Sequence, residues 1–284
     1  MSFRHTIARE VAAEGITLHA GTQVRMMLAP ANPGAGIVFR RADLDGAEVL
    51  ARYDSVAETR LGTMLAAGRA KVDVVEHLMA AVAGAEIDDL LIILDGPEPP
   101  ILDGDALSYL ALIDKAGVKK QQTPRDAIKV LKRVEVAHKD ASAALAPVEA
   151  LVFDFDIAFP SAAIGRQRFS FLFSPDSFRR EIAPARTFGF LRELEQLKKM
   201  DRGHGASLEN TLAVDGDRVI NAGLMRFPDE FVRHKILDAI GDMALAGAPL
   251  IARFEGVRSG HALNNALLRA LFADPANYRL MSLS

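Results

Sequence analysis

The stretch FVRHKILDAIGDMALAG, residues 231–247, decides how this chain is organised. His234, Asp238 and Asp242 follow one another at intervals of four residues, and on a helix such side chains form one stripe. An imidazole and a carboxylate on adjacent turns can both reach one metal ion, whereas the alternative for this helix alone is a solvated polar face. The apolar positions fall roughly opposite the stripe, as an amphipathic helix requires: Val232, Ile236, Leu237, Ile240, Met243 and Ala244.

A second histidine lies in KVDVVEHLMAAVAG, residues 71–84. Asp73 is placed to cap a helix that stops at Gly84, and Glu76 follows three residues later, which is the spacing of a capping box. Glu76 therefore has a purely structural interpretation. His77, on a short apolar helix, can equally be a core histidine or a metal ligand.

A third histidine lies in VRSGHALNNALLRALFADP, residues 257–275. The leucine spacing predicts a helix that follows Ser259-Gly260 and ends at Asp274-Pro275. His261 then stands at the helix entrance, where a ligand can reach it. The alternative is that it only caps the helix or lies exposed on the surface.

These three segments resemble a known family, the zinc-dependent UDP-3-O-acyl-N-acetylglucosamine deacetylases, which act early in lipid A synthesis. The resemblance runs from about residue 3 to the end of the chain, in the family's order and spacing. Strings of this length are far more specific than a short glycine motif. The matching strings are VEHLMAAVAG (75–84), PEPPILDGDA (97–106), ARTFGF (185–190), LMRFPDEFVRHKILDAIGD (224–242) and SGHALNN (259–265).

The resemblance implies a metal site with a base beside it. It implies that His77, His234 and Asp238 are the zinc ligands, and that Glu76 activates the zinc-bound water. The residue types make chemical sense, because two neutral imidazoles and one carboxylate leave an open position on zinc. Water bound there ionises at about pH 7 rather than near 16.

The resemblance also implies the remaining catalytic groups. It assigns His261 as the general acid, Asp242 as the carboxylate that orients it, and Thr187 as the hydroxyl that steadies the developing oxyanion. Amide hydrolysis needs both proton removal from water and proton delivery to the departing amine, which a carboxylate and an oriented histidine provide. Three further residues are implied to face the substrate: Phe188, Lys235 and His19.

The fold that the resemblance implies is α+β. It has two similar domains, each a β-sheet packed on helices, which form a β-α-α-β sandwich with the zinc site between them. The polar connector DKAGVKKQQTPRDA predicts a boundary that divides the chain into domains 1–120 and 121–284, the second with an insert that forms the acyl passage. Patterning predicts strands in 22–30, 36–44, 88–97, 128–140, 150–160 and 166–174, helices near 189–200, 229–247 and 261–272, and a hairpin turning at Asp215-Gly216.

Composition agrees with an enzyme of this kind. The chain has 284 residues, of which 50% are hydrophobic and 25% charged, enough for two ordinary cores. A net charge of −3 and the lack of a dense Lys/Arg block argue against nucleic-acid binding. With no cysteine, disulfides and thiolate ligands are excluded, so only His, Asp and Glu remain for a catalytic metal.

The start of the chain, MSFRHTIAREVAAEG, lacks a continuous apolar segment, and no stretch approaches about 18 apolar residues in a row. We therefore expect a cytoplasmic protein without a transmembrane segment, in contact with a membrane at most peripherally, through its lipid substrate. We also expect a monomer. The expected partner is an acylated UDP-amino-sugar substrate.

The other histidines and the phenylalanines have simpler interpretations. His5, His138 and His204 lack a partner at ligand spacing and are predicted to be surface or loop residues. Six phenylalanines mostly alternate, which favours one buried sheet face, although a lipid-lined passage has the same pattern. They are Phe153, Phe155, Phe159, Phe169, Phe171 and Phe173.

The chain departs from the family pattern outside the metal set. Three hypotheses therefore remain: the lipid A pathway deacetylase, a paralogous zinc amidase with another acylated or nucleotide-linked substrate, and a catalytically weak binding or regulatory relative. The complete set of ligands and proton-transfer groups argues against the third. The departures are Thr17, Ala20, Asp73, Val74, Ile93, Ser161, Ala162 and Ala206.

Overall fold

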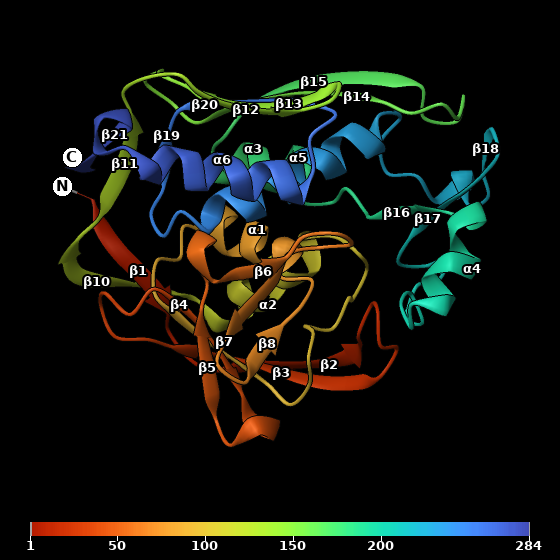
Figure 1. The fold of residues 1–284 in the computed structure, drawn as a ribbon. Helices are drawn as coiled ribbons and strands as arrows, with labels where there is room; N and C mark the ends of the chain where they lie inside the picture. The colour runs from red at the N-terminus through yellow and green to blue at the C-terminus, as the bar shows by residue number, and fades with distance from the viewer. Residues whose placement is uncertain (1, 284) are drawn as a thin grey trace.

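The computed structural model describes residues 2–283 and has four layers (Figure 1). A five-stranded sheet lies at the bottom of the view and another at the top, and helices fill the two layers between them. The predicted α+β fold with a β-α-α-β sandwich is confirmed. Among these residues, no helix combines the length and the apolar character needed to cross a bilayer.

The first half is a sheet of strand order β2-β3-β9-β4-β5. Its pairs are antiparallel except β4 with β9, which run parallel and so need a crossover connection. That crossover contains a small sheet, β6-β7-β8, followed by α1. The elements are β2 (Val11–Ile16), β3 (Gln23–Pro30), β4 (Ile37–Arg41), β5 (Ala47–Leu50), β6 (Val56–Glu58), β7 (Met64–Ala67), β8 (Ala70–Val72), α1 (Glu76–Gly84), β9 (Leu90–Leu94) and α2 (Leu107–Ala116).

The second half repeats this topology strand for strand. Its sheet has the order β12-β13-β20-β14-β15, and its one parallel pair is β14 with β20. The crossover between these two strands contains α5, so α5 is the counterpart of α1, and α6 is the counterpart of α2. The elements are β12 (Val134–His138), β13 (Ala141–Ala146), β14 (Val152–Ala158), β15 (Arg166–Leu172), α5 (Glu230–Ala244), β20 (Arg253–Val257) and α6 (His261–Ala273).

The two crossover helices pack directly against each other in the centre of the molecule (Figure 1). Gly241 of α5 makes this close approach possible, because a Cβ there would stand 2.0 Å from the backbone oxygen of Glu76 on α1. The duplicated topology therefore brings α1 and α5 backbone to backbone. Any side chain near this contact belongs to a site shared by both halves.

The halves are also joined at the edge where the chain ends lie. β1 (Phe3–Ile7) pairs with β10 (Val118–Pro124), and β11 (Asp126–Val130) pairs with β19 (Leu250–Ile251) and β21 (Tyr278–Ser282). The predicted division between residues 120 and 121 falls inside β10 and stays a prediction. The segment 128–140, predicted as one strand, is two strands, because Leu131 turns its backbone N–H to Asn277 and the chain leaves β11 there to enter the main sheet as β12.

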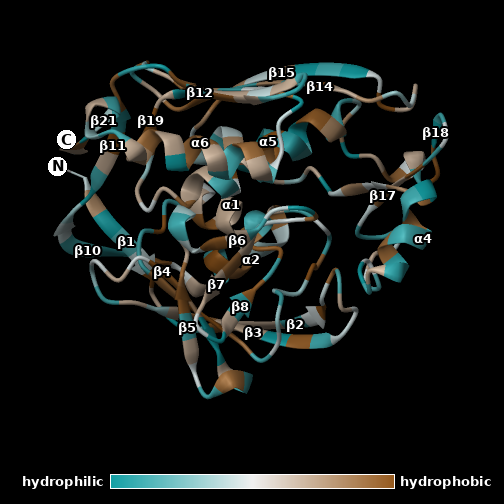
Figure 2. Cartoon of the chain, viewed as in Figure 1, coloured by the Kyte–Doolittle hydropathy of each residue, from teal (hydrophilic) through white to brown (hydrophobic). Residues whose placement is uncertain are grey.

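A third region projects from the second half between β15 and α5 (Figure 1). It contains a small sheet, β16-β17-β18, and the helix α4, whose ribbon is largely hydrophilic in Figure 2. The predicted helix near 189–200 and the hairpin at Asp215-Gly216 are both confirmed. The elements are α3 (Pro175–Ser177), the π-helical turn η3 (Phe178–Ile182), β16 (Phe188–Phe190), α4 (Leu191–Lys199), β17 (Leu212–Asp215), β18 (Arg218–Val219) and the 3₁₀ turn η4 (Ala222–Leu224).

The capping-box interpretation of Glu76 is wrong. Helix α1 begins at Glu76 itself, after Val75, and no side chain caps it. Asp73 accepts a hydrogen bond from Val74, and the backbone of Val74 is left-handed with φ of 55°. A β-branched residue rarely adopts that conformation, so the turn before α1 is strained. Because of this turn, Glu76 is the first residue of the helix and does not cap it, so its carboxylate is available for other contacts.

Candidate metal centre and its surroundings

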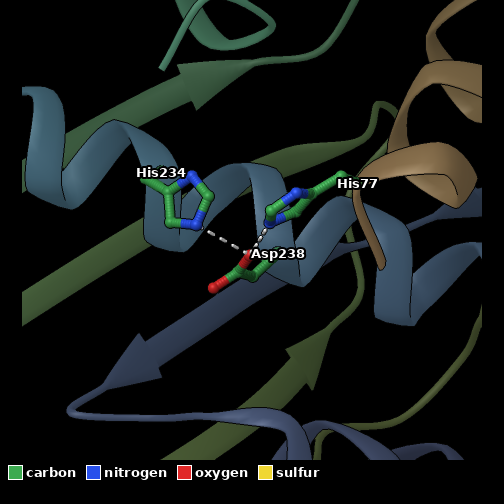
Figure 3. A group of neighbouring side chains, drawn as sticks. All are labelled: His77, His234 and Asp238. Atoms are coloured by element: carbon green, nitrogen blue, oxygen red, sulfur yellow. Dashed lines mark ion pairs between the residues drawn. The ribbon is translucent and has the colours of Figure 1, made fainter. Parts of the chain in front are cut away.

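Three side chains converge where α1 meets α5 (Figure 3). His77 comes from α1, and His234 and Asp238 come from adjacent turns of α5. The Nε2 atoms of His77 and His234 lie 3.5 and 3.3 Å from Asp238 Oδ1, and the three possible ligand atoms are all within 4.8 Å of one another. All three residues are buried. The solvated-face alternative for this stripe is therefore wrong.

The donor atoms fit a metal ion such as zinc. Asp238 Oδ1 is buried and has no hydrogen-bond partner among residues 2–283, a costly state for a carboxylate oxygen. His234 donates its Nδ1–H to the backbone oxygen of Ala185 at 3.1 Å, which leaves a lone pair on Nε2 facing Asp238. Two imidazole nitrogens and one carboxylate oxygen are a typical zinc donor set with an open fourth position.

The protonation states favour the same interpretation. Burial lowers the pKa of His234 to about 4, so its imidazole is neutral at pH 7, as a metal ligand must be. Burial alone raises the pKa of Asp238, but His234 and Lys235 lower it by more, and it lies well below its ordinary value. Lys235 donates to Asp238 Oδ2 at 2.7 Å. The carboxylate thus keeps Oδ1 free while Oδ2 is held.

Glu76 lies beside this trio at the start of α1 and is buried. Its Oε2 accepts a hydrogen bond from the backbone N–H of Thr63 at 3.0 Å, and its Oε1 lies 3.9 Å from His261 Nε2. Burial raises the pKa of this carboxyl, and the charges of His261 and His77 offset only part of that. The absence of a side chain at Gly62 makes room for Glu76 Oε1, because a Cβ on Gly62 would stand only 2.9 Å from that oxygen.

His261 faces Glu76 from α6 and is oriented by Asp242. Its Nδ1 lies 2.9 Å from Asp242 Oδ2, which leaves Nε2 pointing toward Glu76. Burial lowers the pKa of His261, but Asp242 and Glu76 raise it by more, to about 9. His261 is therefore neither a helix cap nor a surface residue, since its side chain is only 14% exposed.

Two residues that the sequence interpretation missed hold Asp242 in place. Thr63 donates its Oγ1–H to Asp242 Oδ1 at 2.6 Å, and Asn264 donates from Nδ2 to Asp242 Oδ2 at 2.8 Å. Asn264 lies one turn after His261 in SGHALNN, so its position on the same helix was a usable signal. Nothing in the sequence connects Thr63 to Asp242, because the two lie 179 residues apart.

Two of the predicted substrate-facing residues, Phe188 and Lys235, contact residues of the candidate metal centre. The ring of Phe188 stands 6.1 Å from that of His234, and Lys235 is bonded to Asp238. Thr187 precedes Phe188 on a segment fixed by its own backbone N–H, which donates to Gly104 at 2.9 Å. His19 is buried on the opposite half, with Nε2 3.2 Å from the backbone oxygen of Leu61, two residues before Thr63.

The phenylalanines of the second half are mostly core residues, as the alternation predicts. Phe153, Phe155 and Phe171 are buried on the inner face of the β14–β15 pair. Phe159 differs, because its ring contacts Phe188 at 5.7 Å between ring centroids. One aromatic side chain thus connects the sheet to the segment beside the candidate metal centre.

The chain was compared with families and proteins of known name. The family model described as UDP-3-O-acyl N-acetylglycosamine deacetylase matches residues 4–273. A UDP-3-O-acyl-N-acetylglucosamine deacetylase of Phenylobacterium zucineum is 45% identical over 281 residues, 98% of this chain and 96% of the relative. The proteins of that name from Myxococcus xanthus and Aliarcobacter butzleri are 44% and 40% identical, over 98% and 99% of this chain and 89% and 93% of the relatives.

Proposed function

This chain belongs to the UDP-3-O-acyl N-acetylglycosamine deacetylase family, and from that premise we propose that it removes the N-acetyl group from UDP-3-O-(3-hydroxyacyl)-N-acetylglucosamine in lipid A synthesis. One observation carries the proposal. A possible metal-ligand trio, a buried carboxylate and an oriented imidazole meet at the contact between α1 and α5. Metal-assisted amide hydrolysis uses this combination of groups.

His77 Nε2, His234 Nε2 and Asp238 Oδ1 would hold the zinc ion. When bound there, zinc supplies Lewis-acid chemistry, which polarises a carbonyl group and lowers the pKa of a water molecule to about 7. Lys235 keeps the other oxygen of Asp238 occupied, so the carboxylate presents a single oxygen to the metal.

Glu76 is the proposed general base. Its Oε2 is held by the Thr63 backbone, so Oε1 is the atom free to accept a proton from the attacking water. Burial raises the pKa of this carboxyl toward the working pH, where a general base is most effective.

His261 is the proposed general acid. Its Nδ1 is engaged by Asp242, so the proton available to the departing nitrogen is the one on Nε2. A pKa of about 9 keeps this imidazole protonated at pH 7, in the state that a general acid requires.

Substrate contacts are assigned to the residues around the centre. We assign the Thr187 hydroxyl to the developing oxyanion, and Lys235, Phe188 and His19 to the sugar nucleotide. The region from η3 to β18 would form the wall of the acyl passage, since Phe159 and Phe188 meet there. A different acylated substrate is the alternative, because Thr17 and Ala206, two departures from the family pattern, lie in touching loops near this wall.

The test is a reaction of zinc-loaded protein with a panel of acylated UDP-N-acetylamino sugars, read by mass for acetate release and alongside metal analysis. We expect one zinc per chain and turnover of the 3-hydroxyacyl substrate. His234→Ala should lose the zinc, whereas Glu76→Gln should keep it and lower turnover by about a hundredfold or more.

Glu149→Gln is the matched control, because Glu149 is an exposed glutamate paired only with Lys129, and it should behave as wild type. Turnover of another N-acyl compound with no acetate release from the named substrate would select the alternative. Near-normal turnover in Glu76→Gln would reject its role as the base.

A further inference from the structure

A second ligand-sized space lies between the two halves, away from the candidate metal centre. This α1–α5 cavity has a volume of about 400 Å³, and no proposed catalytic, substrate-binding or metal residue lines it. Ligand sites typically measure about 300–1,000 Å³ and favour domain interfaces. Its apolar lining includes Ile37, Met79, Val82, Phe153, Ile240 and Met243.

The cavity uses the faces of α1 and α5 that the metal centre does not. Ile240 and Met243 belong to the apolar stripe of α5, opposite the stripe that carries Asp238 and Asp242. This stripe packs against α1, but it leaves space beside Met79. The lining is therefore suited to an apolar chain and not to a sugar or a nucleotide.

Charged groups line the remainder of the cavity, and most of them are already paired. Arg4 donates twice to Asp89, at 2.7 Å each. Arg125 donates to Asp88 and to Glu86, both at 2.8 Å. These arginines are neutralised by their carboxylates, so they favour neither an anion nor a cation.

Arg52 is different. Its Nε lies 3.6 Å from Asp54 Oδ1, which is an ion pair too long for a hydrogen bond, and its guanidinium lies over the ring of Tyr53, 5.7 Å from the centroid. Gly247, which also lines the cavity, leaves room for this guanidinium, because a Cβ there would stand 3.6 Å from Arg52 Nη1. The cavity therefore has a loosely paired cationic fork beside an apolar interior, and such a fork matches a carboxylate in geometry.

We propose that the α1–α5 cavity binds a fatty acid, with its chain between Met79, Met243 and Phe153 and its carboxylate on Arg52. The apolar lining supplies affinity for the chain. The loosely paired guanidinium of Arg52 supplies preference for the anionic head. Each buried methylene should strengthen binding about fourfold, so removing two from the ligand should weaken it at least tenfold.

The experiment uses zinc-loaded protein, deuterated except for its methionine methyl groups, with dodecanoate as the probe. Met79 and Met243 line the cavity, and Met26, buried in β3, does not. We expect nuclear Overhauser contacts from the dodecanoate chain to the methyls of Met79 and Met243 and none to Met26. Decanoate should bind about tenfold more weakly or worse.

Two variants test separately how the cavity binds the hydrocarbon chain of the ligand and how it binds the carboxylate. Ala83→Phe should fill the cavity and abolish the contacts, whereas Ala111→Phe, on the exposed face of α2, should not. Arg52→Gln, at a residue whose side chain is 41% exposed, should weaken dodecanoate to the affinity of dodecanol without disturbing the fold.

The proposal is overturned if dodecanoate contacts neither methionine in the wild-type protein, which would place any bound fatty acid elsewhere, including in the acyl passage. It is also overturned if dodecanol and dodecanoate bind the wild-type protein equally, since Arg52 would then recognise nothing. Because the readout is contact and not deacetylation, failure of the proposed function leaves this test intact.

Discussion

Thr63 connects the two groups proposed to move protons. Its backbone N–H holds Glu76 and its hydroxyl holds Asp242, which in turn orients His261. One residue thus fixes the base and the support of the acid with respect to each other. The bond to Glu76 uses the backbone and the bond to Asp242 uses the hydroxyl, so a side-chain substitution can remove the second and keep the first.

We predict that Thr63→Val lowers turnover about tenfold to a hundredfold with little change in KM. Valine keeps the backbone bond to Glu76 but removes the donor to Asp242, leaving a buried carboxylate oxygen unsatisfied. Thr63→Ser should restore turnover, because it restores the hydroxyl. Steady-state kinetics and zinc content test this, and equal losses in both variants would mean that the methyl group, not the hydroxyl, is needed.

The imidazole of His261 should titrate far above an ordinary histidine. We predict that NMR of zinc-free protein finds its pKa near 9, and that Asp242→Asn moves it down, because the carboxylate that most strongly opposes the effect of burial is then removed. A pKa that does not move in the variant would remove Asp242 as the orienting group. The raised pKa of His261 also predicts how the stability of the protein depends on pH.

The folded-state pKa of His261 lies above the unfolded value of about 6.5. Its contribution to stability is therefore complete below about pH 6.5 and is lost as pH rises through about 9. Urea unfolding across this window should show the free energy of unfolding falling more steeply in the zinc-free wild-type protein than in Asp242→Asn.

At the scale of the elements, the contact of α1 with α5 depends on one glycine. A Cβ at Gly241 would stand 2.0 Å from the backbone oxygen of Glu76, and a backbone atom cannot move aside as a flexible side chain can. We predict that Gly241→Ala costs about 1–3 kcal/mol or more and lowers the turnover of the folded protein about a hundredfold by displacing Glu76.

Gly223→Ala is the matched control for this prediction, because no atom lies within 4 Å of a Cβ built there. Urea unfolding and turnover of both variants give the comparison. If Gly241→Ala is as stable and active as the control, the close helix contact is not required.

Local spacing predicted the elements of the site, but not their contacts. The four-residue interval of His234, Asp238 and Asp242 is a property of one helix, and the sequence displays it directly. The three-residue interval of Asp73 and Glu76 misled, because the left-handed backbone of Val74 breaks the geometry that a capping box needs. Strain of this kind comes from tertiary packing, which a local pattern does not record.

At the scale of the whole molecule, the proposed metal ligands come from both halves. His77 belongs to the first half, and His234 and Asp238 belong to the second. We predict that removing zinc lowers the unfolding temperature, by the equivalent of about 4 kcal/mol when zinc exceeds its dissociation constant a thousandfold. Calorimetry with and without chelator measures it, and Asp238→Asn should show a much smaller difference. Equal unfolding temperatures in the wild-type protein would contradict the site.

The family resemblance anticipated the sandwich, whereas the exact repeat of strand order was visible only in three dimensions. The halves share topology and the position of one parallel pair, β4–β9 and β14–β20, without sharing the residues that build them. Periodicity also could not separate β11 from β12, since both mix apolar and charged residues and they differ in their pairing partners. Pairing partners are set by distant segments.

One contact between the projecting region and the first half is made by two loops, residues 17–19 and 204–206. Gly205 and His204 donate their backbone N–H groups to Leu18 and His19, and a Cβ at Gly205 would stand 2.0 Å from the oxygen of Thr17. Thr17 and Ala206, two residues that differ from the family pattern, therefore lie in the same contact between loops. Because these loops fit backbone to backbone, a chimera that takes only one of them from a relative would put that fit at risk.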